Sequence, residues 1–344
     1  YTIWGLLERW VPGAPPAGAG DIGRDDVGWW LALYAGLAVN ESRLAERIAR
    51  QHQPKLERIR LWLRRTLELG ALPPADRAEA GRVLAVLGDD RPGVGLRADG
   101  LPDLDWCEVP AGAFAMGSKR FDDEMPVRKE MMAAFSIARY PVTHAQFQAF
   151  VEDPDGYAND RWWQGLARLE ADPADASWPI ANHPRERVSW YEAVAFCRWL
   201  TDRLSGSGAI PSGMEIRLPT EQEWEKAARG TDGREWPWGP EWDGTMANTH
   251  EGGLRRTAPV GMYPDGASPY GVLDMAGNVW EWCLNEYGKP ANVGTTGDRP
   301  RVLRGGSWVG NQVAARAASR YDAPPRLRNY DVGFRCVLGS PISG

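Results

Sequence analysis

Arg301-Val-Leu-Arg-Gly-Gly-Ser-Trp308 and, further on, Val332-Gly-Phe-Arg335 frame the most informative segment of the chain. Between these two motifs the residues change in chemistry with no repeat and no amphipathic period. Such an arrangement is typical of a surface segment that is held at both ends. Two longer motifs lie upstream of it, Arg217-Leu-Pro-Thr-Glu-Gln-Glu-Trp224 and Gly271-Val-Leu-Asp-Met-Ala-Gly-Asn-Val-Trp-Glu-Trp282.

The composition is that of a soluble globular protein with room for one large domain or two ordinary ones. The chain has 344 residues, of which 43% are hydrophobic and 25% charged. A net charge of −6 gives no support for nucleic acid as a partner, because backbone phosphates require a basic face. No apolar run is long enough for a membrane span, and no secretory signal is visible. The chain begins at Tyr1, so we expect that an N-terminal piece has been removed, and we favour a cytoplasmic location.

The four cysteines, Cys107, Cys197, Cys283 and Cys336, lie far apart along the chain. They form no C-x-x-C pair and no Cys/His ligand spacing, which argues against structural zinc. Four cysteines in a chain of this length do not make a disulfide scaffold, so we expect free buried thiols.

Residues 1–100 are predicted to form a helical N-terminal segment, the tail of a larger upstream region. Apolar periodicity predicts helices from Val27 to Gln51, from Pro54 to about Leu69 and from Pro73 to Leu87. The second of these carries a run of arginines. A solvated helix face explains that run better than contact with an acidic partner.

From Trp106 the sequence changes to short strands, turns and aromatic residues. Pro110-Ala-Gly112 predicts the turn of a hairpin within residues 107–118, and residues 135–140 are predicted to form a strand. We expect Thr143, Ser189 and Thr220 to cap the helices that follow them, Thr220 in a capping box with Glu223. Residues 237–274 are predicted to form a long loop.

Eight motifs in this part of the chain resemble, in order, those of the sulfatase-modifying factor (formylglycine-generating enzyme) family. They are Gly112-Ala-Phe-Ala-Met-Gly-Ser118, Tyr140-Pro-Val-Thr143, Val188-Ser-Trp-Tyr-Glu-Ala193, Arg217-Leu-Pro-Thr-Glu-Gln-Glu-Trp224, Trp236-Pro-Trp-Gly239, Gly277-Asn-Val-Trp-Glu-Trp282, Arg304-Gly-Gly-Ser-Trp308 and Gly333-Phe-Arg335. The resemblance covers residues 106–338. It implies an α+β domain of the C-type-lectin-like fold, in its formylglycine-generating-enzyme form, with little regular secondary structure.

The same resemblance implies a structural calcium ion. Its ligands would be the side chains of Asp274 and Glu281 and the backbone carbonyls of Gly277 and Val279. Several oxygen ligands on a tight turn suit a hard cation. The alternative is that Asp274 caps the turn and Glu281 pairs with a neighbouring arginine. A second family calcium site, near Asn248, lacks its expected downstream Asp.

Catalysis by the family's two enzymatic branches is not expected. The formylglycine-generating enzymes bind copper(I) through two cysteines in the segment after Arg-Gly-Gly-Ser, because a soft metal requires soft ligands. No cysteine occurs between Gly306 and Arg335. The iron-dependent sulfoxide synthases use three histidines on a helical domain, and here the helical part contains only His52.

A third branch matches the C-terminal segment better: the variable proteins of diversity-generating retroelements. In these proteins, adenine-targeted mutagenesis rewrites selected codons between fixed anchors. The corresponding region here is 304–335, with Arg316, Arg320, Pro325 and Arg328 as internal anchors. The candidate variable positions are Val309, Gly310, Asn311, Ala314, Ser319, Tyr321, Asp322, Ala323, Pro324, Leu327, Asn329, Tyr330 and Asp331.

An internal check supports this interpretation. Randomising the adenines of an Asn codon while keeping its pyrimidine cannot produce Lys, Glu, Gln, Met or Trp, and none of these five occurs at the candidate positions. Gln312 falls between them and would have to be fixed. Trp308 would add to the same surface or lie in the core.

The sequence thus predicts two kinds of position within region 304–335, anchors that hold the backbone and side chains that contact a target. Arg316, Arg320, Arg328 and Arg335 are expected to pair with buried carboxylates or carbonyls and to hold the backbone. The side chains between them, rich in Tyr, Asn, Ser, Gly and Asp, resemble a paratope.

We therefore expect a non-catalytic, receptor-like protein that binds a protein or other macromolecular target through residues 308–331. Three alternatives stay open. Residues 309–331 form an ordinary surface loop; the domain is non-variable and serves as a sensor or effector module fused to an upstream NTPase-like domain; or, last, the chain is a copper-dependent oxidoreductase.

Overall fold

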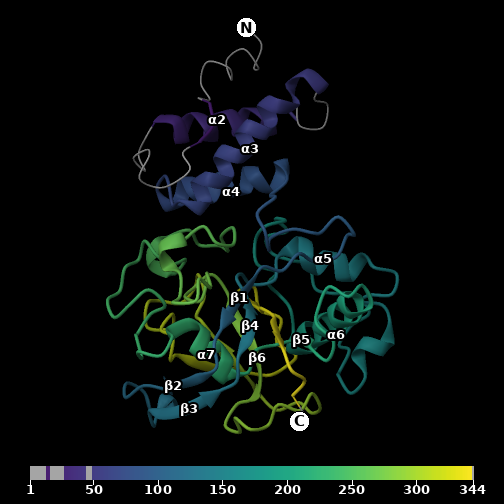
Figure 1. Cartoon of the computed structure of the whole chain (residues 1–344), viewed down its shortest axis with the longest axis vertical. Coiled ribbons are helices and arrows are strands. Elements are labelled where there is room, and N and C mark those ends of the chain that lie inside the picture. The colour runs from purple at the N-terminus through teal and green to yellow at the C-terminus, as the bar shows by residue number, and fades with distance from the viewer. Residues whose placement is uncertain (1–12, 16–26, 44–48, 343–344) are drawn as a thin grey trace.

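A computed structural model describes residues 13–15, 27–43 and 49–342 of the chain. The helices of the N-terminal part form one end of the molecule, and a larger domain of mixed helices and strands forms the other (Figure 1). No helix in these ranges combines the length and apolarity that a membrane crossing requires.

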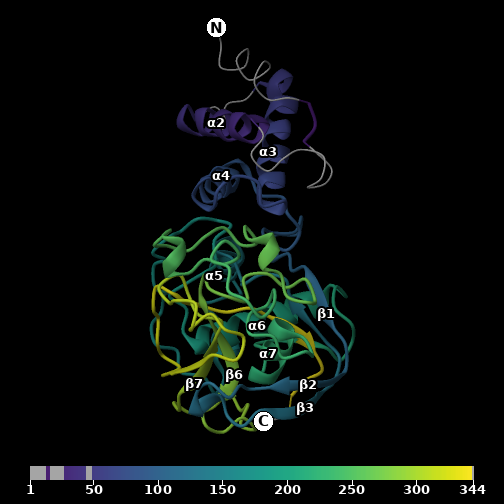
Figure 2. The same ribbon diagram turned by 90° about the vertical axis from the view of Figure 1, so that its left-hand side faces the viewer.

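In its described residues the helical segment contains α2 (Val27–Glu41), α3 (Gln53–Glu68) and α4 (Pro74–Leu87), with a 3-10 turn, η2 (Arg50–His52), before α3. The first predicted helix is shorter than expected, because α2 ends at Glu41; residues 44–48 lie outside the described part. Trp29 and Trp62 meet edge to face in the centre of this bundle, with ring centroids 4.9 Å apart. The bundle also packs against residues 258–263 of the larger domain (Figure 2).

Two four-stranded sheets and a two-stranded ribbon form the larger domain. The first sheet is antiparallel, in the order β1 (Trp106–Val109), β4 (Phe135–Ala138), β10 (Val337–Gly339), β5 (Glu215–Arg217). The second has the order β8 (Arg320–Ala323), β7 (Arg301–Arg304), β6 (Trp280–Glu286), β9 (Val332–Gly333), with β6 and β9 parallel. The ribbon pairs β2 (Gly112–Met116) with β3 (Arg128–Met132).

The hairpin predicted around Pro110–Gly112 is wrong. The strands on the two sides of this turn do not pair with each other: β1 pairs with β4, and β2 pairs with β3. The chain thus passes from the first sheet to the two-stranded ribbon at Gly112, whose φ of 134° is a conformation that favours glycine.

The three predicted helix caps are confirmed. They begin α5 (His144–Glu152), α6 (Trp190–Gly206) and α7 (Glu221–Arg229), and each forms a capping box in which the cap hydroxyl accepts the N3 amide and the N3 side chain accepts the cap amide. Short 3-10 turns occur at η3 (Asp122–Glu124), η4 (Asp160–Trp163), η5 (His250–Gly252) and η6 (Pro264–Gly266). The last two are the regular structure of the long loop predicted at 237–274.

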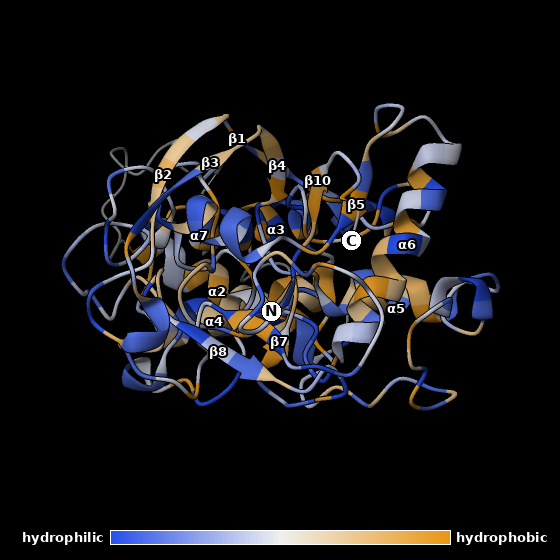
Figure 3. Cartoon of the chain, turned by 90° about the horizontal axis from the view of Figure 1, so that it is seen from below, coloured by the Kyte–Doolittle hydropathy of each residue, from blue (hydrophilic) through white to orange (hydrophobic). Residues whose placement is uncertain are grey.

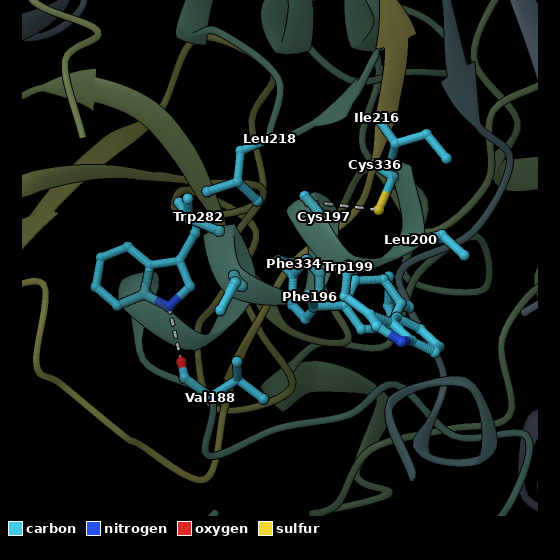
Figure 4. Close-up of a cluster of buried hydrophobic side chains, with 14 of the residues drawn as sticks. Val188, Phe196, Cys197, Trp199, Leu200, Ile216, Leu218, Trp282, Phe334 and Cys336 are labelled. Atoms are coloured by element: carbon cyan, nitrogen blue, oxygen red, sulfur yellow. Dashed lines mark hydrogen bonds between the residues drawn. The ribbon is translucent and has the colours of Figure 1, made fainter. Parts of the chain in front are cut away.

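The main core lies between α5, α6 and the strands. Phe196 and Phe334 pack edge to face at its centre, and the Trp282 indole donates to the carbonyl of Val188 at 2.8 Å (Figure 4). All four cysteines are buried and free, as expected; Cys197 Sγ and Cys336 Sγ lie 3.9 Å apart in this core. Seen from below, the apolar residues gather in the interior while β8 runs along the rim as a largely hydrophilic strand (Figure 3). This rim strand belongs to region 304–335.

Candidate recognition surface

Buried ion pairs hold region 304–335 in place, as the sequence predicted. The four anchor arginines each meet a carboxylate whose side chain is almost completely buried. Each guanidinium makes two hydrogen bonds to its carboxylate, which fixes orientation as well as distance. The pairs are Arg316 with Glu124, Arg320 with Glu221, Arg328 with Glu192 and Arg335 with Glu281.

The partners belong to elements far away in the sequence. Glu221 and Glu192 lie in the first turns of α7 and α6, and Glu192 is also the N3 residue of the α6 capping box. The Arg320 guanidinium donates to Glu221 at 2.7 and 2.8 Å, and Arg328 donates to Glu192 at 2.9 and 3.0 Å. The first turns of these two helices therefore also position the C-terminal segment.

A tight turn carries the chain from β7 into the segment. Gly305 and Gly306 have φ values of 94° and 72°. A Cβ on Gly305 would lie 3.0 Å from the Trp224 ring, and one on Gly306 would lie 2.9 Å from the backbone of Ala314. Glycine is required here by both conformation and space.

Most of the predicted contact positions reach solvent. Tyr321 is 57% exposed, Val309 40% and Tyr330 39%. We call the solvent-reaching positions the candidate surface. Its exposed members are Val309, Asn311, Tyr321, Asp322, Pro324 and Tyr330; its half-buried members are Trp308, Gly310, Ala314, Leu327 and Asn329.

Three predicted contact positions do not face solvent: Ser319, Ala323 and Asp331 are buried. Asp331 belongs to the anchoring of the segment. Its Oδ2 accepts the Ser307 hydroxyl at 2.8 Å, and its carbonyl accepts the Trp280 amide at 2.8 Å. Burial raises the pKa of this carboxyl above its usual range. We therefore leave these three residues out of the candidate surface.

Two aromatic groups mark the candidate surface. In the first, the Trp308 ring lies between those of Trp178 and Tyr330, at centroid distances of 5.3 and 5.6 Å. In the second, Tyr321 lies on Trp280 at 5.8 Å. Rigid aromatic side chains offer large contact area at low cost in conformational entropy, which suits them to binding.

Trp178 and Trp280 were not among the predicted contact residues. Trp178 lies in an irregular stretch that carries no motif, so nothing in the sequence indicated its position. The buried carboxylate of Glu186 fixes it by accepting the backbone amides of Ser177 and Trp178. Trp280 belongs to a motif that we associated with the ion site.

Two of the predicted calcium residues, Asp274 and Gly277, lie on a turn in which Asp274, Gly277 and Asn278 all have positive φ; Val279 follows this turn, and Glu281 lies in β6. Burial raises the pKa of Asp274 to about 6, and its Oδ2 accepts the Gly261 amide at 2.7 Å. Glu281 is fully buried and accepts the Arg335 guanidinium at 2.6 and 2.7 Å. Glu281 thus pairs with a neighbouring arginine, which is the alternative to calcium ligation given above for this residue. The calcium ion itself stays a prediction. Within the described ranges, no three His, Cys, Asp or Glu side chains gather as a metal site.

Residues 103–339 match the sulfatase-modifying factor enzyme 1-like domain. The hercynine oxygenase of Mycolicibacterium smegmatis is 34% identical over 276 residues, which cover 68% of this chain and 59% of that protein. The formylglycine-generating enzyme of Thermomonospora curvata is 32% identical over 295 residues, which cover 67% of this chain and 91% of that enzyme. This chain spans less than two thirds of the first of these relatives.

Among solved structures, variable protein 1 of Treponema denticola is similar. It has 25% sequence identity and a TM-score of 0.53, and the match covers 68% of this chain and 95% of that one. The similarity confirms the C-type-lectin-like α+β fold expected from the motifs.

Proposed function

Because the chain belongs to the sulfatase-modifying factor enzyme 1-like family, we propose that it is a non-catalytic, binding member of that family. Its candidate surface would recognise a protein or other macromolecular target by shape and hydrogen bonding. The observation that carries this proposal is the separation between buried anchors and exposed intervening residues in one segment.

This separation has a physical consequence for variation. Substitutions at exposed positions change folding stability by less than about 0.5 kcal/mol, whereas breaking a buried ion pair costs about 3–5 kcal/mol. Region 304–335 can therefore change its contact chemistry at Val309, Tyr321 or Tyr330 without losing its shape. That property is what retroelement diversification of a binding protein requires, and it supports the finer proposal that the surface is diversified in this way.

The copper chemistry of the formylglycine-generating branch has no ligands in this segment. All four cysteines of the chain lie outside residues 306–335 and are buried in the cores. Burial raises the pKa of the Cys197 and Cys283 thiols far above the usual range, which opposes the thiolate form that binds copper. A binding function is therefore favoured over an oxidoreductase.

We also propose calcium as a structural ion at the turn of residues 274–281. Near pH 7 the Asp274 carboxylate is charged while buried, a state that a neighbouring cation would stabilise. Carbonyls of Gly277 and Val279 would complete the oxygen ligands. An upstream NTPase-like domain and a cytoplasmic location stay predictions of the sequence.

The test of diversification is sequencing of the 3′ end of the gene and its flank in several isolates. We expect substitutions confined to the candidate surface and to adenines of a nearby template copy, beside a reverse-transcriptase gene. An invariant segment with no such copy would overturn diversification and leave the non-variable sensor or effector module.

A further inference from the structure

The helical segment is joined to the larger domain by a buried polar contact. Asp89 and Arg91, which follow α4, form an ion pair at 2.7 Å with both side chains nearly inaccessible. Arg91 also donates to the carbonyl of Val260 at 2.8 Å, and the Asn182 amide donates to Asp89 at 2.8 Å. The backbone amide of Val260 in turn donates to the carbonyl of Asn182 at 2.9 Å. These bonds close a ring between the two parts.

Apolar packing surrounds this ring. Ala258, Met262 and Tyr263 belong to the same buried cluster as the helices α2, α3 and α4. Gly81 of α4 lies so close to Pro259 that an added Cβ would be 2.4 Å from the proline Cγ. Residues 258–263 are therefore part of the helical core, although they belong to the long loop of the larger domain.

Asn278 connects this loop to the candidate surface. Its side chain accepts the amide of Ala258 at 2.9 Å and donates to the Ala258 carbonyl at 3.2 Å. Its own carbonyl accepts the amide of Trp308 at 3.1 Å. Asn278 is fully buried and has a φ of 66°, so tertiary contacts hold its conformation. Asn278 thus connects Ala258, a member of the helical core, directly to the backbone of Trp308.

A second connection runs through the preceding part of the same loop. The amide of His250 donates to the carbonyl of Gly310 at 2.9 Å, and the Glu251 carboxylate accepts the amide of Gln312 at 2.9 Å. Asn248 links this part to Asn278, because its carbonyl accepts the Asn278 amide at 2.8 Å. Residues 308–312 are therefore backed by the loop that the helices hold.

We propose that the helical segment positions the candidate surface through residues 258–262 and Asn278. Coupling between two sites is reciprocal, so a target that fixes Trp308 also stabilises the docking of α4. Target binding at the candidate surface would then change how firmly the helical segment is docked, and a neighbouring domain or partner could respond to that change. The connection from α4 through Asn278 to Trp308 does not depend on what the candidate surface binds. That target binding acts on the helical segment rests on the proposed function.

The test compares two glycine-to-alanine variants within the helical segment. Gly81→Ala pushes on Pro259, whereas Gly36→Ala, the control, pushes on Val83 and Leu63 inside the bundle at 2.9 and 3.0 Å. Amide hydrogen exchange is measured on the full chain. We expect Gly81→Ala to speed exchange at Trp308, His250 and Gln312 on the order of tenfold, the size expected for a local opening. Gly36→Ala should leave these amides unchanged.

Three outcomes would overturn the proposal. In the first, Gly81→Ala speeds exchange at residues 258–262 but not at Trp308. In the second, both variants speed exchange throughout the chain alike. The third outcome concerns a substitute variant, Arg91→Lys, which is used if Gly81→Ala does not fold. Lysine keeps the charge but lacks the planar fork that spans Asp89 and Val260. If exchange of the Trp308 amide is unchanged in Arg91→Lys, the proposal is overturned. None of these outcomes bears on binding at the candidate surface, which has its own test.

Discussion

Removing one anchor arginine should destabilise the domain far more than changing any exposed residue beside it. The pair of Arg316 with Glu124 shows this most clearly, because the two side chains are 1% and 2% exposed. In an Arg316→Met variant, Glu124 would keep a buried charge, and within the described residues its carboxylate would retain a hydrogen bond from the Ser118 hydroxyl. Breaking such a pair from one side costs about 3–5 kcal/mol of unfolding free energy.

The matched control is Gln312→Met, four residues earlier and exposed, which should change the unfolding free energy by less than about 0.5 kcal/mol. The assay is denaturant unfolding followed by tryptophan fluorescence. A double variant, Arg316→Met with Glu124→Met, should be more stable than the sum of the two single losses predicts, since no unpaired charge is left. A loss below about 1 kcal/mol in Arg316→Met would refute the anchoring argument.

Further predictions concern the turn, the aromatic groups and the metal. With chelator present, the free energy of unfolding should fall by about 3 kcal/mol as the pH rises from about 4 to 6. The reason is that the fold raises the pKa of Asp274 from 3.8 to about 6 and so favours its neutral form. Thermal unfolding over a pH series measures this, and an equally steep pH dependence in Asp274→Asn contradicts it. Added calcium should raise the melting temperature of the wild type above pH 6 and have little effect on Asp274→Asn, as calorimetry would show. Tyr321→Ala and Tyr330→Ala should each weaken binding of an identified target by more than about tenfold with unfolding free energy within about 0.5 kcal/mol of wild type, checked by titration calorimetry. Anaerobic titration with copper(I) should give no tight site, and a stoichiometric thiolate complex would revive the oxidoreductase.

Local sequence signals predicted the elements whose chemistry is local. A cap such as Ser189 needs only the residue three positions later, so the sequence contains the whole motif. The anchor arginines were predicted from the layout implied by the resemblance to the variable proteins, in which fixed residues separate the variable ones. The identity of an arginine's partner was not predictable, because Glu124 precedes Arg316 by 192 residues.

Two predictions failed because their outcome depends on residues that are not adjacent in the sequence. The turn at Pro110–Gly112 has the composition of a hairpin, but β1 is completed by β4, which pairs in turn with β10 near the C-terminus. Turn chemistry carries no information about strands that come later in the chain, here β4 as the partner of β1 and β3 as the partner of β2. The burial of Ser319, Ala323 and Asp331 was missed likewise, because a codon pattern does not show which way a side chain points.

The docking of the helical segment left a weak signal in the sequence, Gly81. In the sequence, Gly81 indicates a position within a helix where glycine lowers the helix propensity. The structure gives it a reason, since Pro259 occupies the space of its side chain. A glycine inside a helix indicates that another segment packs closely against it, but the sequence does not identify that segment.

The central claim is that region 304–335 contains anchor positions that are needed for folding and exposed positions that are free to contact a target. Two libraries of variants displayed on a cell or phage surface test this claim most directly. One library randomises the adenines of Asn codons at exposed positions of the candidate surface, and the other does the same at the four anchor arginines. Members of the first library should fold as often as the parent and yield binders to unrelated proteins, while the second should lose folded display almost completely. Equal loss of folded display in both libraries would contradict the account.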